Sequence, residues 1–200
     1  MRTRNNSSRK PRDHRKLRKR FLIVTDGMIT EQGYFERIKQ LAYDSIKVVA
    51  RNKDIDKLVE LAKAIKEKSD YDTVAMVCDI DQRLQNEKSK KTLMHAISVA
   101  EKNGIIMCMS HESFEIWLLA HLGQVKSSMK NRAQAHDACI KKGIMKGSNG
   151  KEIVAEKITR DSILAAMAEV KRLRNTYGDS ILVSAPMTEV DKIMSKIVFD

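Results

Sequence analysis

Residues 21–35 read FLIVTDGMITEQGYF, and this stretch decides the fold. The apolar run Phe21–Val24 leads into Asp26 and Gly27, and an amphipathic segment follows at once. A continuous apolar run of this kind is typical of a strand that is buried on both faces. A strand that ends on an acid either turns a corner or presents a carboxylate. A second stretch, TVAMVCDIDQR at 73–83, repeats the arrangement, so the answer depends on whether the two strand ends meet.

Strand-like and helix-like segments alternate beyond residue 20. The helices are expected at 30–43, 54–68 and 88–103, and the strands at 21–25, 45–50, 73–78 and 105–109. Asp54 is placed to cap the second helix and Gly104 to end the third. Such βαβ repetition predicts an α/β fold, Rossmann-like, with a mainly parallel sheet flanked by helices. In sheets of this type the ligand site lies outside the carboxyl ends of the strands.

The second half of the sequence is predicted to be mostly helical. The expected helices span 112–121, 125–142, 161–176 and 188–197, with a short late strand at 180–184. We therefore divide the chain into three parts. These are a basic arm (1–20), an α/β core (21–122) and a helical extension of the same domain (123–200).

Most of the net charge of +12 lies in the arm. Residues 1–20 contain ten Lys or Arg and a single acid, which leaves the remaining 180 residues at only +3. Such an arm is predicted to be disordered and to bind nucleic-acid phosphates by counterion release, although a purely solubilising tail is an open alternative. The candidate contacts are Arg9, Lys10, Arg12, Arg15, Lys16, Arg18, Lys19 and Arg20.

Composition favours a cytoplasmic protein that does not enter a membrane. No apolar segment of signal-peptide length follows the basic residues, and no run approaches a membrane span. The three cysteines are odd in number and show no CxxC spacing, and Cys78 and Cys108 are expected to be buried. His95, His121 and His136 have no partners at metal-ligand spacing and are expected on the surface.

The acids at the strand ends are the candidate chemistry. Asp79 and Asp81 would project on one face of an extended chain, and Asp26 would join them if the first and third strands are neighbours. Glu31, one turn into the following helix, could reach the same place. Crowded carboxylates favour a divalent cation such as Mg²⁺. The alternative, that DxD merely marks a polar turn, stays open, and Gly27 suits either a turn or a close phosphate.

Other sites find less support in the sequence. Neither GxxxxGK[ST] nor GxGxxG occurs, which argues against P-loop and dinucleotide chemistry. A receiver-like phosphoacceptor would need a lysine after a fifth strand, and 180–184 contains none. Tyr34, Phe35 and Trp117 are expected to pack in the core.

Four segments resemble the RloB-like family. The run 21–35 resembles its opening, an apolar strand followed by EGxxTExxYF, and 77–81 its strand ending in DxD. The segment 110–121, SHESFEIWLLAH, is similar to its S-N-P-x-F-E-x-W-L-L-x-H pattern, and 186–190 to its late P-x-T motif. The matches occur in the same order over about 20–195.

This resemblance implies a Toprim-type fold and a nuclease of phage defence. It implies that Asp79 and Asp81 bind Mg²⁺ or Mn²⁺, together with Asp26, and that Asp26 takes the place of the family's catalytic glutamate. Glu31 and Glu115 become further catalytic candidates. A partner ATPase or restriction subunit is also implied.

The sequence departs from the family pattern at two places, so two functions stay open. Asp26 is one methylene shorter than the family's glutamate, and proton-transfer geometry tolerates little displacement. The family's Asn-Pro is replaced by His111 and Glu112. The chain is expected either to be a Mg²⁺-dependent nuclease acting on RNA or DNA, or to be a catalytically vestigial, nucleic-acid-binding accessory subunit of a defence or restriction complex.

Overall fold

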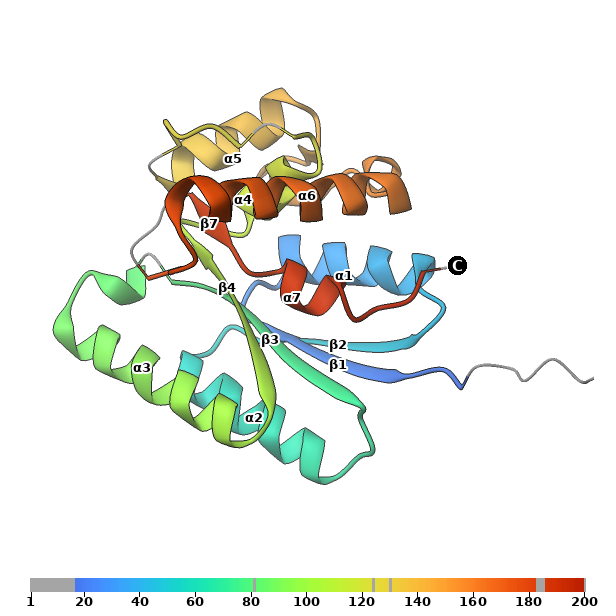
Figure 1. The fold of residues 1–200 in the computed structure, drawn as a ribbon, viewed down its shortest axis with the longest axis vertical. Coiled ribbons are helices and arrows are strands. Elements are labelled where there is room, and N and C mark those ends of the chain that lie inside the picture. Colours follow the sequence, from blue (N-terminus) through green and yellow to red (C-terminus); the bar gives the residue numbers. More distant parts are fainter. Residues whose placement is uncertain (1–16, 81, 124, 130, 183–185, 200) are drawn as a thin grey trace, which may run out of the picture.

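A five-stranded, mainly parallel sheet forms the centre of the molecule (Figure 1). The structure is a computed structural model that describes residues 17–80, 82–123, 125–129, 131–182 and 186–199. The strand order is β2-β1-β3-β4-β7, and only β7 runs antiparallel to its neighbour. The strands are β1 (Arg20–Thr25), β2 (Ser45–Ala50), β3 (Thr73–Asp79), β4 (Ile105–His111) and β7 (Met187–Thr188). The predicted α/β class is confirmed.

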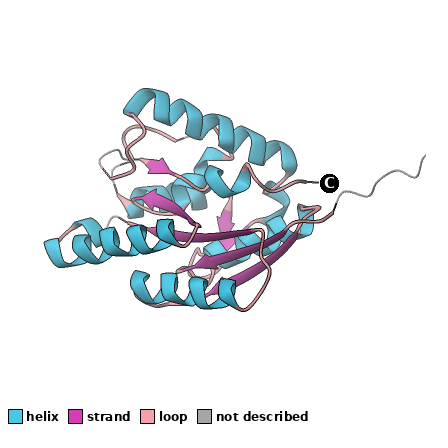
Figure 2. Ribbon diagram, turned by 60° about the horizontal axis from the view of Figure 1, so that its bottom comes forward, coloured by secondary structure: helices cyan, strands magenta, loops and turns pink. Residues whose placement is uncertain are grey.

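Helices cover both faces of the sheet (Figures 1 and 2). On one face lie α2 (Ile55–Glu67) and α3 (Glu87–Lys102). On the other face lie α1 (Thr30–Leu41), α4 (Glu115–Ala120), α5 (Arg132–Lys141), α6 (Arg160–Tyr177) and α7 (Asp191–Met194). The remaining elements are β5 (Met145–Lys146), β6 (Glu152–Ile153) and the 3₁₀ turns η1 (Gln82–Leu84) and η2 (Ala155–Lys157).

The register of β1 and β3 answers the question posed by the two acidic strand ends. The strands are direct neighbours, and Thr25 pairs with Val77. The backbone N–H of Asp26 continues the ladder by donating to the Val77 carbonyl at 3.3 Å. Residues 21–24 and 74–78 are buried on both faces, as continuous apolar strands of a parallel sheet should be. The two acidic ends therefore meet at one edge of the sheet.

The helix ends differ in part from the predictions. Asp54 stands at the N-cap of α2, but its side chain makes no capping hydrogen bond and instead lies 3.4 Å from Lys57 Nζ. At α3 the Asn86 side chain caps by accepting from the Ser89 N–H. Gly104 follows the end of α3 with φ +59°, a left-handed conformation that glycine adopts at little cost.

In the second half α6 confirms the helix predicted at 161–176, whereas α4 and α5 are shorter than predicted. Glu112 has φ +72°, which no right-handed helix allows, so α4 begins only at Glu115. The Asn131 side chain caps α5 by accepting from the Gln134 N–H, so this helix begins at Arg132 instead of near residue 125.

The late strand also differs from its prediction. The described residues of the predicted strand, 180–182, form no strand, and the rest of it lies outside the described residues. The edge strand is β7 instead, and the helix predicted at 188–197 contracts to α7. The basic arm lies mostly outside the described ranges, so its disorder stays a prediction.

An aromatic cluster forms the core beside α1. Tyr34, Phe35 and Trp117 are fully buried, as predicted, and Tyr34 packs edge-on against Phe35, Phe114 and Trp117. The surface prediction for His121 is wrong. Its Nε2 lies 3.1 Å from Tyr34 Oη and its Nδ1 3.0 Å from Ser162 Oγ, and burial lowers its pKa to about 3.

Three cysteines are free and buried, which confirms the prediction for Cys78 and Cys108. Within the described residues, no helix has the length and apolar character needed to cross a membrane.

The ion pair between α6 and α7 is expected to stabilise the packing of these two helices against each other. Arg174 donates two hydrogen bonds of 2.6 Å to Asp191, and both side chains are partly buried. We expect Arg174→Ala to lower the free energy of unfolding by about 2 kcal/mol, because Asp191 loses a charged, bidentate partner. Urea unfolding followed by Trp117 fluorescence measures this. The exposed Lys171 on the same helix provides the control, and equal effects of Lys171→Ala and Arg174→Ala would contradict the expectation.

Candidate active site

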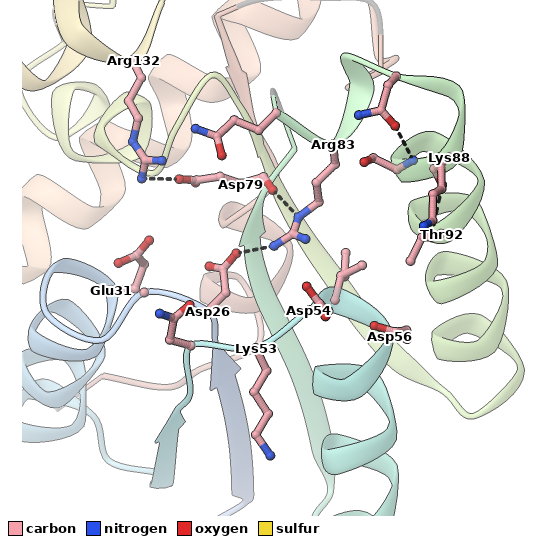
Figure 3. A pocket seen from close by; sticks show the side chains of 16 residues that line it. Asp26, Glu31, Lys53, Asp54, Asp56, Asp79, Arg83, Lys88, Thr92 and Arg132 are labelled. Carbon is pink, nitrogen blue, oxygen red and sulfur yellow. Dashed lines mark hydrogen bonds and ion pairs between the residues drawn. The ribbon is translucent and has the colours of Figure 1, made fainter.

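Three carboxylates lie at the carboxyl edge of the sheet. Asp26 follows β1, Asp79 ends β3, and Glu31 stands in the first turn of α1. Figure 3 shows the three side chains around one polar space. Strand order brings Asp26 and Asp79 together, since neighbouring parallel strands end at the same edge, and the first turn of α1 adds Glu31.

Gly27 makes room for the carboxylate of Glu31. A Cβ atom at position 27 would overlap all three atoms of the Glu31 carboxylate. The glycine is therefore needed for close approach, because no positive φ is found at this position. Thr25 Oγ1 donates to the Gly27 carbonyl at 2.9 Å and holds the turn. The Asp-Gly pair thus turns the chain and admits a second acid beside the first.

Two arginines bind the aspartates. Arg83 Nη2 lies 3.0 Å from Asp26 Oδ2, and Arg83 Nε donates to the Asp79 carbonyl at 3.0 Å. Arg132 Nη2 lies 2.9 Å from Asp79 Oδ2. Arg83 comes from η1, directly after β3, whereas Arg132 comes from the start of α5 (Figure 3). The aspartates are thereby partly neutralised by two different parts of the chain.

Burial raises the pKa values of all three acids, and repulsion by neighbouring acids adds to this at Glu31 and Asp79. The pKa of Glu31 rises to about 7, first because the side chain is buried and next because Asp26 lies beside it. Burial, with the charges of Glu31 and Asp26, raises the pKa of Asp79 well above its usual range. Burial also raises the pKa of Asp26, against the opposing effect of Arg83. The cluster therefore favours the presence of additional positive charge.

Glu115 lies behind the cluster. It stands in the first turn of α4, is 5% exposed, and does not line the cavity in front of the aspartates. Its charge nevertheless contributes to the raised pKa of Glu31, after burial and Asp26. Its Oε2 atom is buried and finds no hydrogen-bond partner among the described residues. A buried carboxylate oxygen of this kind is costly unless another group binds it.

Not every predicted site residue can be placed at this edge. Asp81 and the arm residues up to Lys16 lie outside the described residues. Arg18, Lys19 and Arg20 lie at the opposite, amino-terminal end of β1, where the guanidinium of Arg18 stacks over Tyr43 and that of Arg20 over Tyr71. These three basic residues do not line the cavity. The binding of nucleic acid by the arm stays a prediction.

The cavity in front of the acids has a volume of about 790 Å³ and extends to the amino-terminal ends of α2 and α3. The residues that line it are mostly polar: Asp26, Gly27, Glu31, Asn52, Lys53, Asp54, Ile55, Asp56, Asp79, Gln82, Arg83, Asn86, Lys88, Ser89, Thr92 and Arg132. Arg83, Lys88 and Arg132 were not predicted from the sequence. Arg83 stands four residues after Asp79, a spacing that could have indicated it. Arg132 has no comparable signal.

The residues present fit a divalent cation. Within the described ranges, no three His, Cys, Asp or Glu side chains are arranged as they stand to hold a metal ion, and Asp81 lies outside those ranges. Asp79 Oδ1, however, is buried and has no hydrogen-bond partner among the described residues. Carboxylate oxygens are the ligands that Mg²⁺ prefers. Asp79 and Asp26 would hold such an ion, and its charge would offset their repulsion.

A family model described as RloB-like protein matches residues 21–197. The chain belongs to the RloB-like family. No curated protein and no solved structure matches it significantly. The match begins at the first strand and ends after α7, so it includes every residue of the carboxylate cluster.

One loop of this RloB-like protein is incompatible with the family pattern described above. Glu112 occupies the position of the pattern's proline and has φ +72°. The proline ring fixes φ near −65°, so a proline could not adopt this conformation. His111 and Glu112 line a second cavity, of about 610 Å³, next to the first.

Burial of Glu31 predicts a characteristic pH dependence of stability. Its folded-state pKa of about 7 lies above the ordinary 4.5, so the folded protein binds a proton more tightly and loses stability as pH rises through this range. We expect Glu31→Gln, in EDTA, to unfold like the natural chain near pH 4.5 and to be up to about 3 kcal/mol more stable near pH 8.

The measurement is the difference in unfolding free energy between the two chains across this pH range. Taking the difference removes the opposite contribution of His121, whose lowered pKa destabilises the fold at acid pH. Glu36→Gln, on the exposed side of the same helix, is the control. A pH-independent difference for Glu31→Gln would show that Glu31 ionises normally.

Proposed function

We propose that this protein is a Mg²⁺- or Mn²⁺-dependent nuclease with a Toprim-type active site. The observation that supports this most is the cluster of Asp26, Glu31 and Asp79, three buried acids that repel one another at the carboxyl edge of a parallel sheet. Such a cluster has little structural value, because each acid is costly to bury. Its chemistry is well suited to a divalent cation beside a polar cavity.

Each residue has a distinct role in the proposed reaction. Asp26 and Asp79 would hold the cation with Asp81. A bound divalent cation supplies Lewis-acid stabilisation of the charge that develops on a phosphodiester. Glu31 ionises near pH 7, which suits a general acid or base that gives or takes a proton at its carboxylate. Burial and the charge of Asp26, with a smaller contribution from Glu115, would keep that pKa high. Arg83 would hold Asp26 in place through its contact with the Asp79 backbone.

The basic arm would add affinity that does not depend on sequence. Ten basic residues in 1–20 would contact phosphates and release counterions, so binding should weaken as salt rises. Nucleic acid, RNA or DNA, is thus the proposed partner. A role in phage defence and an activating ATPase or restriction subunit belong to the same proposal through the family resemblance, and a cytoplasmic location belongs to it through composition.

Two observations favour a second function. Asp26 and Asp79 are each bound to an arginine, which neutralises them without a metal ion, and Asp26 is shorter than the glutamate of the family pattern. Both features suit a nucleic-acid-binding accessory subunit that does not cleave. Such a subunit would bind nucleic acid equally well in EDTA, with strong salt dependence and no turnover.

Cleavage assays separate the two functions. Purified protein is incubated with tRNA, mixed RNA, single-stranded DNA and plasmid in Mg²⁺, Mn²⁺ or EDTA. We expect cleavage only with a cation, and a fall of at least about 100-fold in Asp79→Asn, because the buried oxygen that would hold the ion becomes an amide.

The matched control is Asp161→Asn, which neutralises an exposed carboxylate at the start of α6. Full activity of Asp79→Asn would exclude this site. Binding without cleavage in every cation would favour the accessory subunit.

A further inference from the structure

Arg132 differs from Arg83 in how it is held. Arg83 is part of the turn that follows β3, and its Nε is fixed on the Asp79 carbonyl. Its side chain is 24% exposed. Arg132 begins α5, is 53 residues from Asp79 in the sequence, and its side chain is 48% exposed. The guanidinium of Arg132 can therefore leave Asp79 by rotating its own side chain into solvent.

Asp79 is the buried member of the pair. Its side chain is only 11% exposed, against 48% for Arg132. An ion pair with one half-exposed partner contributes little net free energy, because water competes for the arginine. The carboxylate, by contrast, needs a further partner, because its Oδ1 atom is buried and has no hydrogen-bond partner among the described residues. A divalent cation would satisfy this need better than one guanidinium and would repel it.

Arg132 also lies where two cavities meet. It lines the 790 Å³ cavity in front of the acids and the 610 Å³ cavity beside His111 and Glu112. Each cavity is within the size range of ordinary ligand sites. Because Arg132 borders both cavities, it could contact a chemical group that links a moiety bound in one cavity to a moiety bound in the other. In a nucleic-acid strand, that group is the phosphate between successive nucleotides.

The chemistry of the side chain agrees with this position. Guanidinium presents a planar set of donors that matches two oxygens of a phosphate, and Arg–phosphate pairs are among the stronger charge-assisted contacts. The same fork now contacts Asp79 Oδ2 (Figure 3). The guanidinium could therefore exchange its contact with Asp79 for a contact with a phosphate.

We propose that Arg132 exchanges Asp79 for a backbone phosphate of the nucleic-acid strand when a divalent cation occupies the carboxylate cluster. The inference rests on the proposed function only in requiring a cation and a nucleic acid at this edge. Arg132, at the start of α5, is then a substrate-binding residue. Its contact with Asp79 holds the side chain near the site until the cation binds.

The experiment measures binding instead of cleavage. Arg132→Gln removes the charge and keeps a polar side chain, and Arg132→Lys keeps the charge without the fork. Lys141→Gln, at the exposed end of the same helix, is the matched control for charge. Mn²⁺ alone is titrated into each protein by calorimetry. A fluorescent single-stranded 12-mer, as DNA and as RNA, is then titrated in EDTA and in Ca²⁺ over a range of salt, with its integrity checked by electrophoresis.

Three results are expected for Arg132→Gln. Mn²⁺ binds at least as tightly as in the natural chain, because a competing cation has been removed. The affinity for the 12-mer falls about tenfold in Ca²⁺, and the slope of log K against log salt becomes shallower by about 0.7, one single-strand phosphate contact. Affinity and slope do not change in EDTA, where Arg132 stays on Asp79. In Ca²⁺ the affinity of Arg132→Lys for the 12-mer lies between those of the natural chain and Arg132→Gln. Lys141→Gln shows none of these changes.

Other results would overturn the proposal. Weaker Mn²⁺ binding in Arg132→Gln would mean that Arg132 supports the ion instead of competing with it. If Arg132→Gln and Lys141→Gln bind the 12-mer with the same affinity in Ca²⁺, the ion pair of Arg132 only stabilises the packing of α5 on the sheet. The same conclusion follows if the natural chain binds no 12-mer. If Arg132→Gln does not fold, the same comparisons are made with Arg132→Lys. Because binding alone decides these outcomes, a chain that binds but never cleaves would refute the nuclease and leave this inference standing.

Discussion

The pairing of β1 with β3 is the constraint on which the site depends. It places the ends of both strands at the same edge of the sheet, so Asp26 and Asp79 become neighbours. Every other feature of the site compensates for that placement. Gly27 leaves space for a third carboxylate, and Arg83 and Arg132 supply charge that the buried aspartates require. Such a cluster is unfavourable on its own, and the proposed cation would offset the repulsion between its members.

Much of this arrangement follows from local patterns in the sequence. The apolar runs that precede Asp26 and Asp79, with amphipathic helices between them, predict a parallel sheet and put both acids at its carboxyl edge. The sequence patterns do not predict that β1 and β3 are direct neighbours. Strand order depends on which helices cover which face, and a periodicity does not contain that information.

The parts that the sequence did not predict depend on contacts between distant residues. Arg132 reaches Asp79 because α5 folds back over the sheet, and nothing near either residue indicates this. His121 is buried because Tyr34 and Ser162, from two other helices, satisfy both ring nitrogens. Glu112 breaks the expected helix through a positive φ that its residue type does not announce. Local propensity is overridden at each of these positions by tertiary packing.

The contacts of Arg83 affect how substitutions at Asp26 and Asp79 should be interpreted. One guanidinium joins the Asp26 carboxylate to the backbone of Asp79, so the two strand ends form a single thermodynamic unit. Removing Asp26 frees the guanidinium that also positions the main chain of Asp79. The effects of single substitutions at the two aspartates should therefore not add, and only a double-mutant cycle that includes Arg83 can assign separate contributions to them.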